Sequence, residues 1–225
     1  MTQSTTEVVD RIDADQTDPG PARISRGHLV AKALTAEGVD TIFTLCGGHI
    51  YDCVDEGIKV VNVPPRAGRS TCRRRVRPDQ RQPGCAVVTA GPGTADDITG
   101  IANAFRAESP MLLIGGQGAL DQHKLGSLQE PPHVDMMTPI TKFAAAVPRT
   151  ARMGDMVSMA FRECYNGAPG PSFLEIPRDI LGGSVPVNET TVPEAGHYRA
   201  HPVGSAAPPA HPPACPSKEE PWDRH

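Results

Sequence analysis

Three glycine-rich turns, each at the end of an apolar run, are the features of this sequence best suited to holding a small ligand. They are Gly47–Gly48, Gly91–Pro92–Gly93 and Gly115–Gly116. Glycine has no Cβ, so it permits tight turns and a close approach of the main chain to a bound molecule. Any one of these turns could serve only to reverse the chain, but three of them together favour a ligand site.

Several well-known chemistries are excluded by the motifs that the sequence lacks. It contains neither the GxGxxG pattern of dinucleotide-binding turns nor the GxxxxGK[ST] pattern of phosphate-binding loops. It also lacks the GxSxG pattern that presents a nucleophilic serine in hydrolases. The glycine turns are therefore not assigned to a nicotinamide enzyme, a nucleotide triphosphatase or a serine hydrolase.

Composition excludes other classes of protein. The net charge of -4 offers no general attraction for nucleic acid. The polar N-terminus has no signal-peptide pattern, and no apolar run is long enough to span a bilayer, so we expect a cytoplasmic protein. The cysteines lack CxxC spacing and are read as reduced thiols, so no metal site is predicted. They are Cys46, Cys53, Cys72, Cys85, Cys164 and Cys215.

The elements that would position the glycine turns alternate between strands and helices. Six apolar runs predict strands, at 40–45, 58–63, 85–90, 110–116, 140–147 and 171–177. Helical patterns lie at 25–38, 91–109 and 154–167, the first beginning at Ser25 as N-cap and ending at Gly38. This order predicts an α/β fold with a doubly wound, mostly parallel six-stranded sheet and helices on both faces. Such sheets bind ligands beyond the carboxyl ends of their strands, where these turns fall.

The chain divides into one predicted domain and several less regular segments. Residues 1–23 predict a disordered leader, 24–181 the domain, and 182–225 a linker and a disordered tail rich in proline. Within the domain, the basic segment 64–83 has no hydrophobic period of either kind, and it stands where a helix should follow the second strand. The end of the tail, rich in proline, alanine and histidine without periodicity, also reads as if it were translated out of frame.

The order and spacing of five motifs resemble a known family. They are EGVDTIFTLCGGHI, VVTAGPGTADDITGIANAFRAESPMLLIGGQ, LQE, ITKFA and GAPGPSFLEIPRD. Together they resemble the N-terminal pyrimidine-binding domain of thiamine-diphosphate enzymes, within the group of acetolactate synthases, oxalyl-CoA decarboxylases and 2-hydroxyacyl-CoA lyases. The resemblance covers about two thirds of the chain.

The resemblance implies a set of cofactor-binding residues. These are Cys46, Gly47, Gly48, Gly91, Pro92, Gly93, Asp96 and Gln129, with Lys142 close to a largely structural FAD. In the family, the cofactor lies between this domain and the diphosphate-binding domain of a dimer partner, which also holds Mg²⁺. The resemblance therefore implies thiamine diphosphate as cofactor, possible FAD, and a homodimer or a full-length paralogue as partner.

The glutamate that carries the family's chemistry is absent. In the family this carboxyl group hydrogen-bonds a ring nitrogen of the aminopyrimidine, which lets the cofactor remove its own thiazolium proton. Here no Glu occurs between Gly57 and Glu108, and Arg66 stands at its place. The resemblance thus implies no catalytic residue in this chain.

A shift of reading frame accounts for the missing glutamate. With suitably chosen wobble bases, 64–83 read one base later translate as RHEQAARRAADGYARTNGNP, the family's helix with its glutamate. We therefore interpret this segment as the product of two compensating frameshifts, near Val63 and near Pro83. The rival interpretation is a functional basic loop for phosphate or nucleic acid, but the segment lacks interleaved aromatic residues.

Three functions remain open from the sequence. The first is an N-terminal fragment of an acetolactate-synthase-like enzyme, which joins small 2-oxo acids in branched-chain amino acid synthesis. The second is an oxalyl-CoA decarboxylase or 2-hydroxyacyl-CoA lyase domain, and the third is a non-catalytic module that docks on a full-length paralogue. We expect this chain to be inactive on its own, even after Arg66→Glu.

Overall fold

The computed structural model describes residues 22–45, 57–62, 84–127 and 129–192. Residues 1–21 of the predicted leader, the segment 64–83 and residues 193–225 of the predicted tail lie outside these residues, so the predictions made for them stay untested. None of the described helices is both long and apolar enough to cross a membrane.

A parallel sheet of six strands forms the centre of the fold, in the order β3-β2-β4-β5-β7-β6. The strands are β2 (Thr41–Leu45), β3 (Lys59–Asn62), β4 (Gly84–Val88), β5 (Met111–Gln117), β6 (Phe143–Ala146) and β7 (Pro171–Pro177). β4 and β7 are buried along their whole length, because neighbours cover both faces of the central strands. The predicted doubly wound fold is confirmed.

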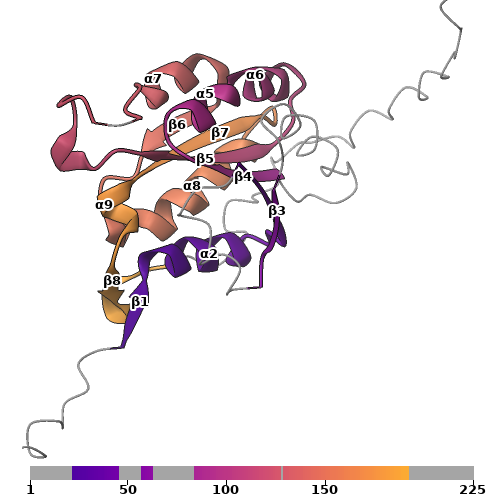
Figure 1. Ribbon diagram of the computed structural model, residues 1–225. Helices are drawn as coiled ribbons and strands as arrows, with labels where there is room; N and C mark the ends of the chain where they lie inside the picture. The colour runs from indigo at the N-terminus through magenta and orange to yellow at the C-terminus, as the bar shows by residue number, and fades with distance from the viewer. Residues whose placement is uncertain (1–21, 46–56, 63–83, 128, 193–225) are drawn as a thin grey trace, which may run out of the picture.

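Helices cover both faces of the sheet (Figure 1). On one face, α2 (Arg26–Ala36) and α8 (Met153–Tyr165) pack over side chains such as Ile42, Leu112 and Leu174, which we call the α2–α8 cluster. On the other face, α5 (Pro92–Asp96), α6 (Ile98–Arg106) and α7 (His133–Met137) lie above Leu113 and Phe173, the α6–α7 cluster. Successive strand residues point to opposite faces, so both clusters are built from the same strands.

The helix predicted at 25–38 has the ends that its sequence indicates. The Ser25 hydroxyl accepts the His28 N–H at 3.1 Å, which satisfies one of the free donors of the first turn of α2. Gly38 follows the helix with a φ of 82°, the left-handed conformation that commonly ends a helix.

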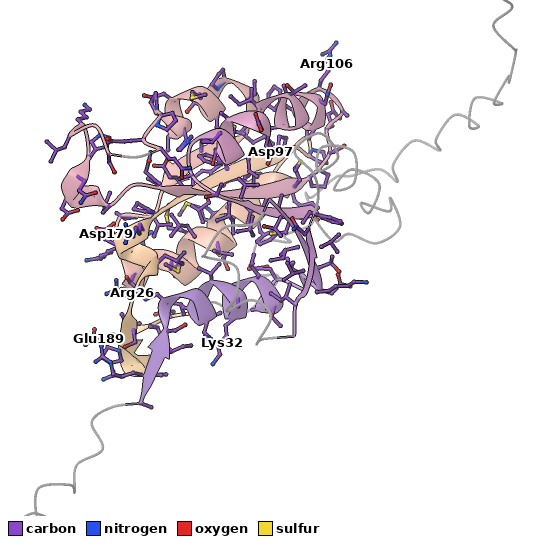
Figure 2. The ribbon with its side chains drawn as sticks, viewed as in Figure 1. Arg26, Lys32, Asp97, Arg106, Asp179 and Glu189 are labelled. Atoms are coloured by element: carbon purple, nitrogen blue, oxygen red, sulfur yellow. The ribbon has the colours of Figure 1, made fainter. Side chains whose placement is uncertain are left out.

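The helix predicted at 91–109 is two helices, α5 and α6, that meet at Asp97 (Figure 2). Asp97 donates its N–H to the Thr94 carbonyl at 3.2 Å, a tighter turn than the α-helix makes. Within α6, Ala104 is buried, whereas Phe105 is 43% exposed.

The packed region extends beyond the predicted domain end at residue 181. β1 (Arg23–Ser25) pairs antiparallel with β8 (Ser184–Pro186), and Val192 packs against the α2–α8 cluster. The remaining short elements are η2 (Leu120–Gln122), η3 (Thr138–Ile140), η4 (Thr150–Arg152), α9 (Arg178–Leu181) and η5 (Val187–Glu189). The part of the predicted linker up to Val192 is therefore structured, because a short sheet and an apolar contact tie it to the domain.

Candidate functional site

The turn after β4 lies at the carboxyl edge of the sheet and has a conformation that only glycine adopts easily. Gly91 has φ 67° and ψ −118° and forms the N-cap of α5. Pro92 follows at the first helical position, where its fixed φ suits the helix and its missing N–H is not needed. Gly91 and Gly93 are buried, whereas Pro92 is exposed.

Gln129 lies directly against Gly91. A Cβ built on Gly91 would stand 2.7 Å from the Gln129 Cβ, closer than real side chains approach. Gln129 itself has φ 61°, which is uncommon outside glycine. Its side chain is exposed and makes no hydrogen bond to the rest of the described chain. The structure therefore brings together two of the predicted site positions, from segments far apart in the sequence.

The loop that carries Gln129 is held at both of its ends. Near its start, the Leu120 N–H donates to the Asp179 carboxylate at 3.0 Å. Asp179 lies beside Arg26, whose guanidinium donates to the backbone carbonyl of Asp179 (Figure 2). Near its end, the Glu130 carboxylate accepts the N–H of Ser127 at 3.0 Å and also that of Lys124. Because Glu130 follows Gln129 directly, this clamp fixes the backbone next to the candidate ligand residue.

A buried polar network lies beneath the turn. His133, fully buried at the start of α7, accepts the Gly91 N–H at its Nε2 over 3.1 Å. Its Nδ1 lies 3.0 Å from Glu175 Oε2 on β7, and Gln117 Nε2 on β5 lies 3.1 Å from the same oxygen. Gln117 Nε2 also donates to the Pro131 carbonyl at 3.0 Å. Groups from several elements thus converge under one turn.

The hydrogen bonds of this network determine the protonation of the imidazole. Nε2 receives the Gly91 N–H, so it must carry a lone pair, and the ring proton must be on Nδ1. Nδ1–H then donates to the Glu175 carboxylate. The 3.4 Å contact between Gln117 Nε2 and Nδ1 joins two donors and is not a hydrogen bond.

The sequence patterns did not single out Gln117, His133 and Glu175 as site residues. Two signals could have found Gln117 and Glu175. Glu175 is the only charged residue in the apolar run PSFLEIP, and Gln117 ends another buried strand. A polar side chain inside a strand buried on both faces requires a partner, since an unpaired buried polar group costs several kcal/mol. Nothing in the sequence identified His133 as that partner.

The third glycine turn has a different role from the one expected. Gly115 and Gly116 lie inside β5. A Cβ on Gly115 would stand 2.7 Å from Thr94 Oγ1, and a Cβ on Gly116 would stand 3.0 Å from the Ala90 nitrogen. These glycines therefore allow α5 and the end of β4 to pack closely on β5. Their close approach is to the protein's own chain.

Two of the remaining predicted positions, Asp96 and Lys142, lie among the described residues. Asp96 is exposed at the end of α5. Cys46, Gly47, Gly48 and Arg66 lie outside the described residues. Among the residues that the structure describes, no group of His, Cys, Asp or Glu could hold a metal ion.

Lys142 lies at the opposite edge of the sheet from Gly91. It immediately precedes β6, its N–H donates to the Pro171 carbonyl at the start of β7, and its Nζ donates to the Asn166 carbonyl. Burial lowers the pKa of Lys142, while the nearby Cys164 and Glu163 oppose that shift. The predicted FAD-proximal lysine is therefore separated from the turn by the length of the strands.

Comparisons with known proteins match this chain to one family and to two kinds of enzyme. Residues 24–137 match a family described as thiamine pyrophosphate enzyme, N-terminal TPP binding domain. The acetolactate synthase large subunit IlvG of Mycobacterium tuberculosis is 34% identical over 168 residues, 72% of this chain and 31% of that protein. The 2-hydroxyacyl-CoA lyase 2 of Caenorhabditis elegans is 38% identical over 159 residues, covering 69% of this chain and 25% of that protein. The chain thus spans about a quarter to a third of the length of these relatives.

Proposed function

This chain belongs to the thiamine pyrophosphate enzymes and carries their N-terminal TPP-binding domain, and we propose that its Gly91 turn and Gln129 hold the aminopyrimidine ring of the cofactor. The observation that carries the proposal is the contact between Gly91 and Gln129 at the carboxyl edge of a parallel sheet. The family motifs imply that both residues bind the cofactor, and both lie where open sheets of this kind bind ligands.

The side chains present suit an aminopyrimidine. The Gln129 amide is exposed, and it can donate and accept hydrogen bonds at once, as an amino group next to a ring nitrogen requires. When bound, thiamine diphosphate supplies the electron sink for breaking a carbon–carbon bond beside a carbonyl. The chain's own residues would bind and orient the ring.

A carboxylate that could activate the cofactor is missing from the position where the family has it, because Arg66 stands there. Glu175 does not replace it. Glu175 is buried, and its Oε2 already accepts hydrogen bonds from His133 and Gln117. We therefore expect this chain to orient a pyrimidine ring without activating it.

For the whole enzyme we propose carbon–carbon bond formation between small 2-oxo acids, as in acetolactate synthases of branched-chain amino acid synthesis. We also propose that a diphosphate-binding domain holds Mg²⁺ and that FAD binds near Lys142. The proposed partner is a second copy of the chain or a full-length paralogue, and the proposed location is the cytoplasm. The second candidate is cleavage of 2-hydroxyacyl-CoA or oxalyl-CoA substrates, favoured by the 38% identity to a 2-hydroxyacyl-CoA lyase. The third is a non-catalytic module that docks on a paralogue.

A titration of the ¹⁵N-labelled chain with thiamine diphosphate tests the binding proposal. We expect the amide signals of Gly91, Gly93 and Gln129 to move, with a Kd of about 1 mM, because hydrogen bonds to one ring amount to roughly −4 kcal/mol. Inorganic pyrophosphate is the control and should leave these signals in place. Shifts confined to the Lys142 edge, or no shifts at about 10 mM cofactor, would contradict the proposal.

Pyruvate consumption with thiamine diphosphate, Mg²⁺ and FAD tests the expectation of inactivity. The chain and its Arg66→Glu variant should both stay at background, because the single substitution leaves the rest of the basic segment unchanged. Cofactor-dependent loss of pyruvate by the unmodified chain would show that another residue activates the cofactor. Stable association with a full-length acetolactate synthase in sedimentation, with altered activity of that enzyme, would support the docking module instead.

A further inference from the structure

We propose that His133, held by Glu175, is a positioning residue that sets the place of Gly91 against Gln129. This inference rests on the proposed function, since it assigns to the buried network the task of holding the ligand turn. It concerns residues that lie under the site, none of which faces the ligand. The network links β5, β7 and α7 to the turn after β4 through one imidazole.

The Gly91 N–H needs an acceptor that its own helix cannot supply. Gly91 is the N-cap of α5, and N-cap N–H groups have no intrahelical partner. The residue is buried, so water does not serve as that partner, and a buried N–H without an acceptor is costly. The lone pair of His133 Nε2, 3.1 Å away, is the acceptor that the fold provides.

Glu175 makes this acceptor available. A neutral imidazole carries one proton, on either nitrogen, and only the Nδ1–H form leaves Nε2 free to accept. The Glu175 carboxylate accepts from Nδ1 at 3.0 Å and so favours that form. Gln117 donates to the same carboxylate oxygen and holds it in place.

Two other roles for this His–Glu pair fit the geometry less well. A catalytic pair needs a nitrogen that faces the substrate, but Nε2 is taken by Gly91 and the ring is fully buried. A pair retained for stability alone is not expected either, because apolar residues of similar volume often stabilise a protein as well as a buried polar pair. The direction of Nε2 toward Gly91 is what distinguishes a positioning role.

Two substitutions at position 133 separate the contacts of the two ring nitrogens. His133→Gln can place an amide oxygen near the site of Nε2, where it can accept the Gly91 N–H. His133→Asn can place its amide near the site of Nδ1, where it can donate to Glu175 but cannot reach Gly91. The side chains differ by one methylene, and each loses one of the two contacts, so both variants should lose comparable thermal stability.

The readouts are hydrogen exchange of the Gly91 amide and the thiamine diphosphate titration, both on the full chain. For His133→Asn we expect exchange about tenfold faster and binding about fivefold or more weaker, as loss of a buried hydrogen bond implies. His133→Gln should stay within about twofold of the unmodified chain, because the Gly91 acceptor is kept. Equal affinity in all three proteins, with cofactor binding intact, would overturn the inference.

Two further measurements keep the two proposals apart. If the unmodified chain does not bind the cofactor, the proposed function fails, and the exchange rates still decide whether His133 holds Gly91. The ¹⁵N shifts of the His133 ring give an independent check that needs no variant. The Nδ1–H tautomer is expected, and the Nε2–H tautomer would overturn the role assigned to His133. Glu175→Gln should keep the tautomer, and Glu175→Ala should lose it.

Discussion

At the scale of single residues, the candidate site depends on one glycine that has no conservative replacement. Gly91 combines a positive φ with a neighbour, Gln129, that occupies the space a Cβ would need. Both features come from the same turn, so any side chain there is strained and also displaces Gln129. The sequence motif predicted that Gly91 belongs to the site. The structure adds the contact with Gln129, which explains why no side chain fits at this position.

Gly91→Ala should therefore be more harmful than the same change at Gly167, which has a nearly equal φ of 69° and nothing within 4 Å of its missing Cβ. We expect a loss of about 1–2 kcal/mol of unfolding free energy for Gly167→Ala from backbone strain alone, and about 2–4 kcal/mol for Gly91→Ala. Chemical denaturation measures both, and the Gln129 amide signal should move only in Gly91→Ala. Equal losses of unfolding free energy in the two variants would show that Gln129 moves away from the new methyl group without destabilising the protein.

Cys164 should be unreactive in the folded chain. It is buried, its thiol donates to the Met111 carbonyl at 3.2 Å, and burial raises its pKa from 9.0 to about 11. At pH 8 only about one thiol in a thousand is then the reactive thiolate. Alkylation by iodoacetamide, followed by mass spectrometry of the Cys164 peptide, should be far slower than in urea-denatured chain. Rapid labelling at pH 8 would show that α8 opens.

The same pKa shift predicts a loss of stability in alkaline solution. Folding raises the pKa of Cys164, so the folded chain holds this proton more tightly than the unfolded chain does. The contribution is complete below pH 9 and is lost as the pH rises toward 11. Cys164→Ala should reduce the loss of unfolding free energy between those pH values. An unchanged pH dependence would contradict the assignment.

At the scale of elements, the segment after β7 is joined to the domain by backbone contacts that its composition did not reveal. β8 pairs with β1 at the far end of the chain, and residues 191–192 lie across the start of α8. The close approach is possible because α8 has a glycine at its second position. A Cβ on Gly154 would stand 2.2 Å from the Thr191 carbonyl oxygen.

Gly154→Ala is expected to destabilise the protein, although the same change in an exposed helix interior stabilises by about 1 kcal/mol. The new methyl group would push away the segment at Thr191 and with it Val192, which packs on the α2–α8 cluster. We expect a net loss of about 1–3 kcal/mol of unfolding free energy, as for other overpacked sites. In a chain that ends at Thr190 the substitution should become neutral or stabilising. A loss of equal size in both chains would place its cause within α8.

At the scale of the whole molecule, the sheet is well covered at its centre and less covered at the β3 edge. The central strands β4 and β7 are buried throughout, whereas Val60 and Val61 of β3 are only partly buried, one against each cluster. In the family pattern, a helix follows this strand. Its sequence resembles the one that residues 64–83 give when they are read one base later. We therefore expect a sequence change that covers the β3 edge to stabilise the fold more than a change elsewhere on the sheet.

Replacing residues 64–83 by RHEQAARRAADGYARTNGNP should raise the unfolding temperature. An added helix could cover several hundred Å² of apolar surface, which at about 25 cal/mol per Å² has an upper limit on the order of 10 kcal/mol. Each kcal/mol raises Tm by roughly 2–4 °C in a protein of this size. Calorimetry on both chains measures the difference, with a scrambled version of the new segment as the control. An unchanged Tm would contradict the frameshift interpretation.

The sequence by itself determined the class of fold and the family. Continuous apolar strands that alternate with amphipathic helices form a parallel sheet almost regardless of detail, because burial on both faces demands that pattern. The turn Gly91–Pro92–Gly93 was also predictable, because these residues act locally. Glycine permits a positive φ, and proline fixes φ and has no backbone N–H to donate. So were the two ends of α2, because Ser25 and Gly38 act within one turn of the helix.

Only the tertiary structure decided what surrounds that turn. The contact of Gln129 with Gly91, and the Gly91–His133–Glu175 network beneath it, join residues up to 84 positions apart, from Gly91 to Glu175. A local pattern shows that Glu175 needs a partner but not which one, because the partner is chosen by strand order and by the path of the loop. The same holds for Gly115, Gly116 and Gly154. Their missing side chains make room for chain segments that no spacing rule connects to them.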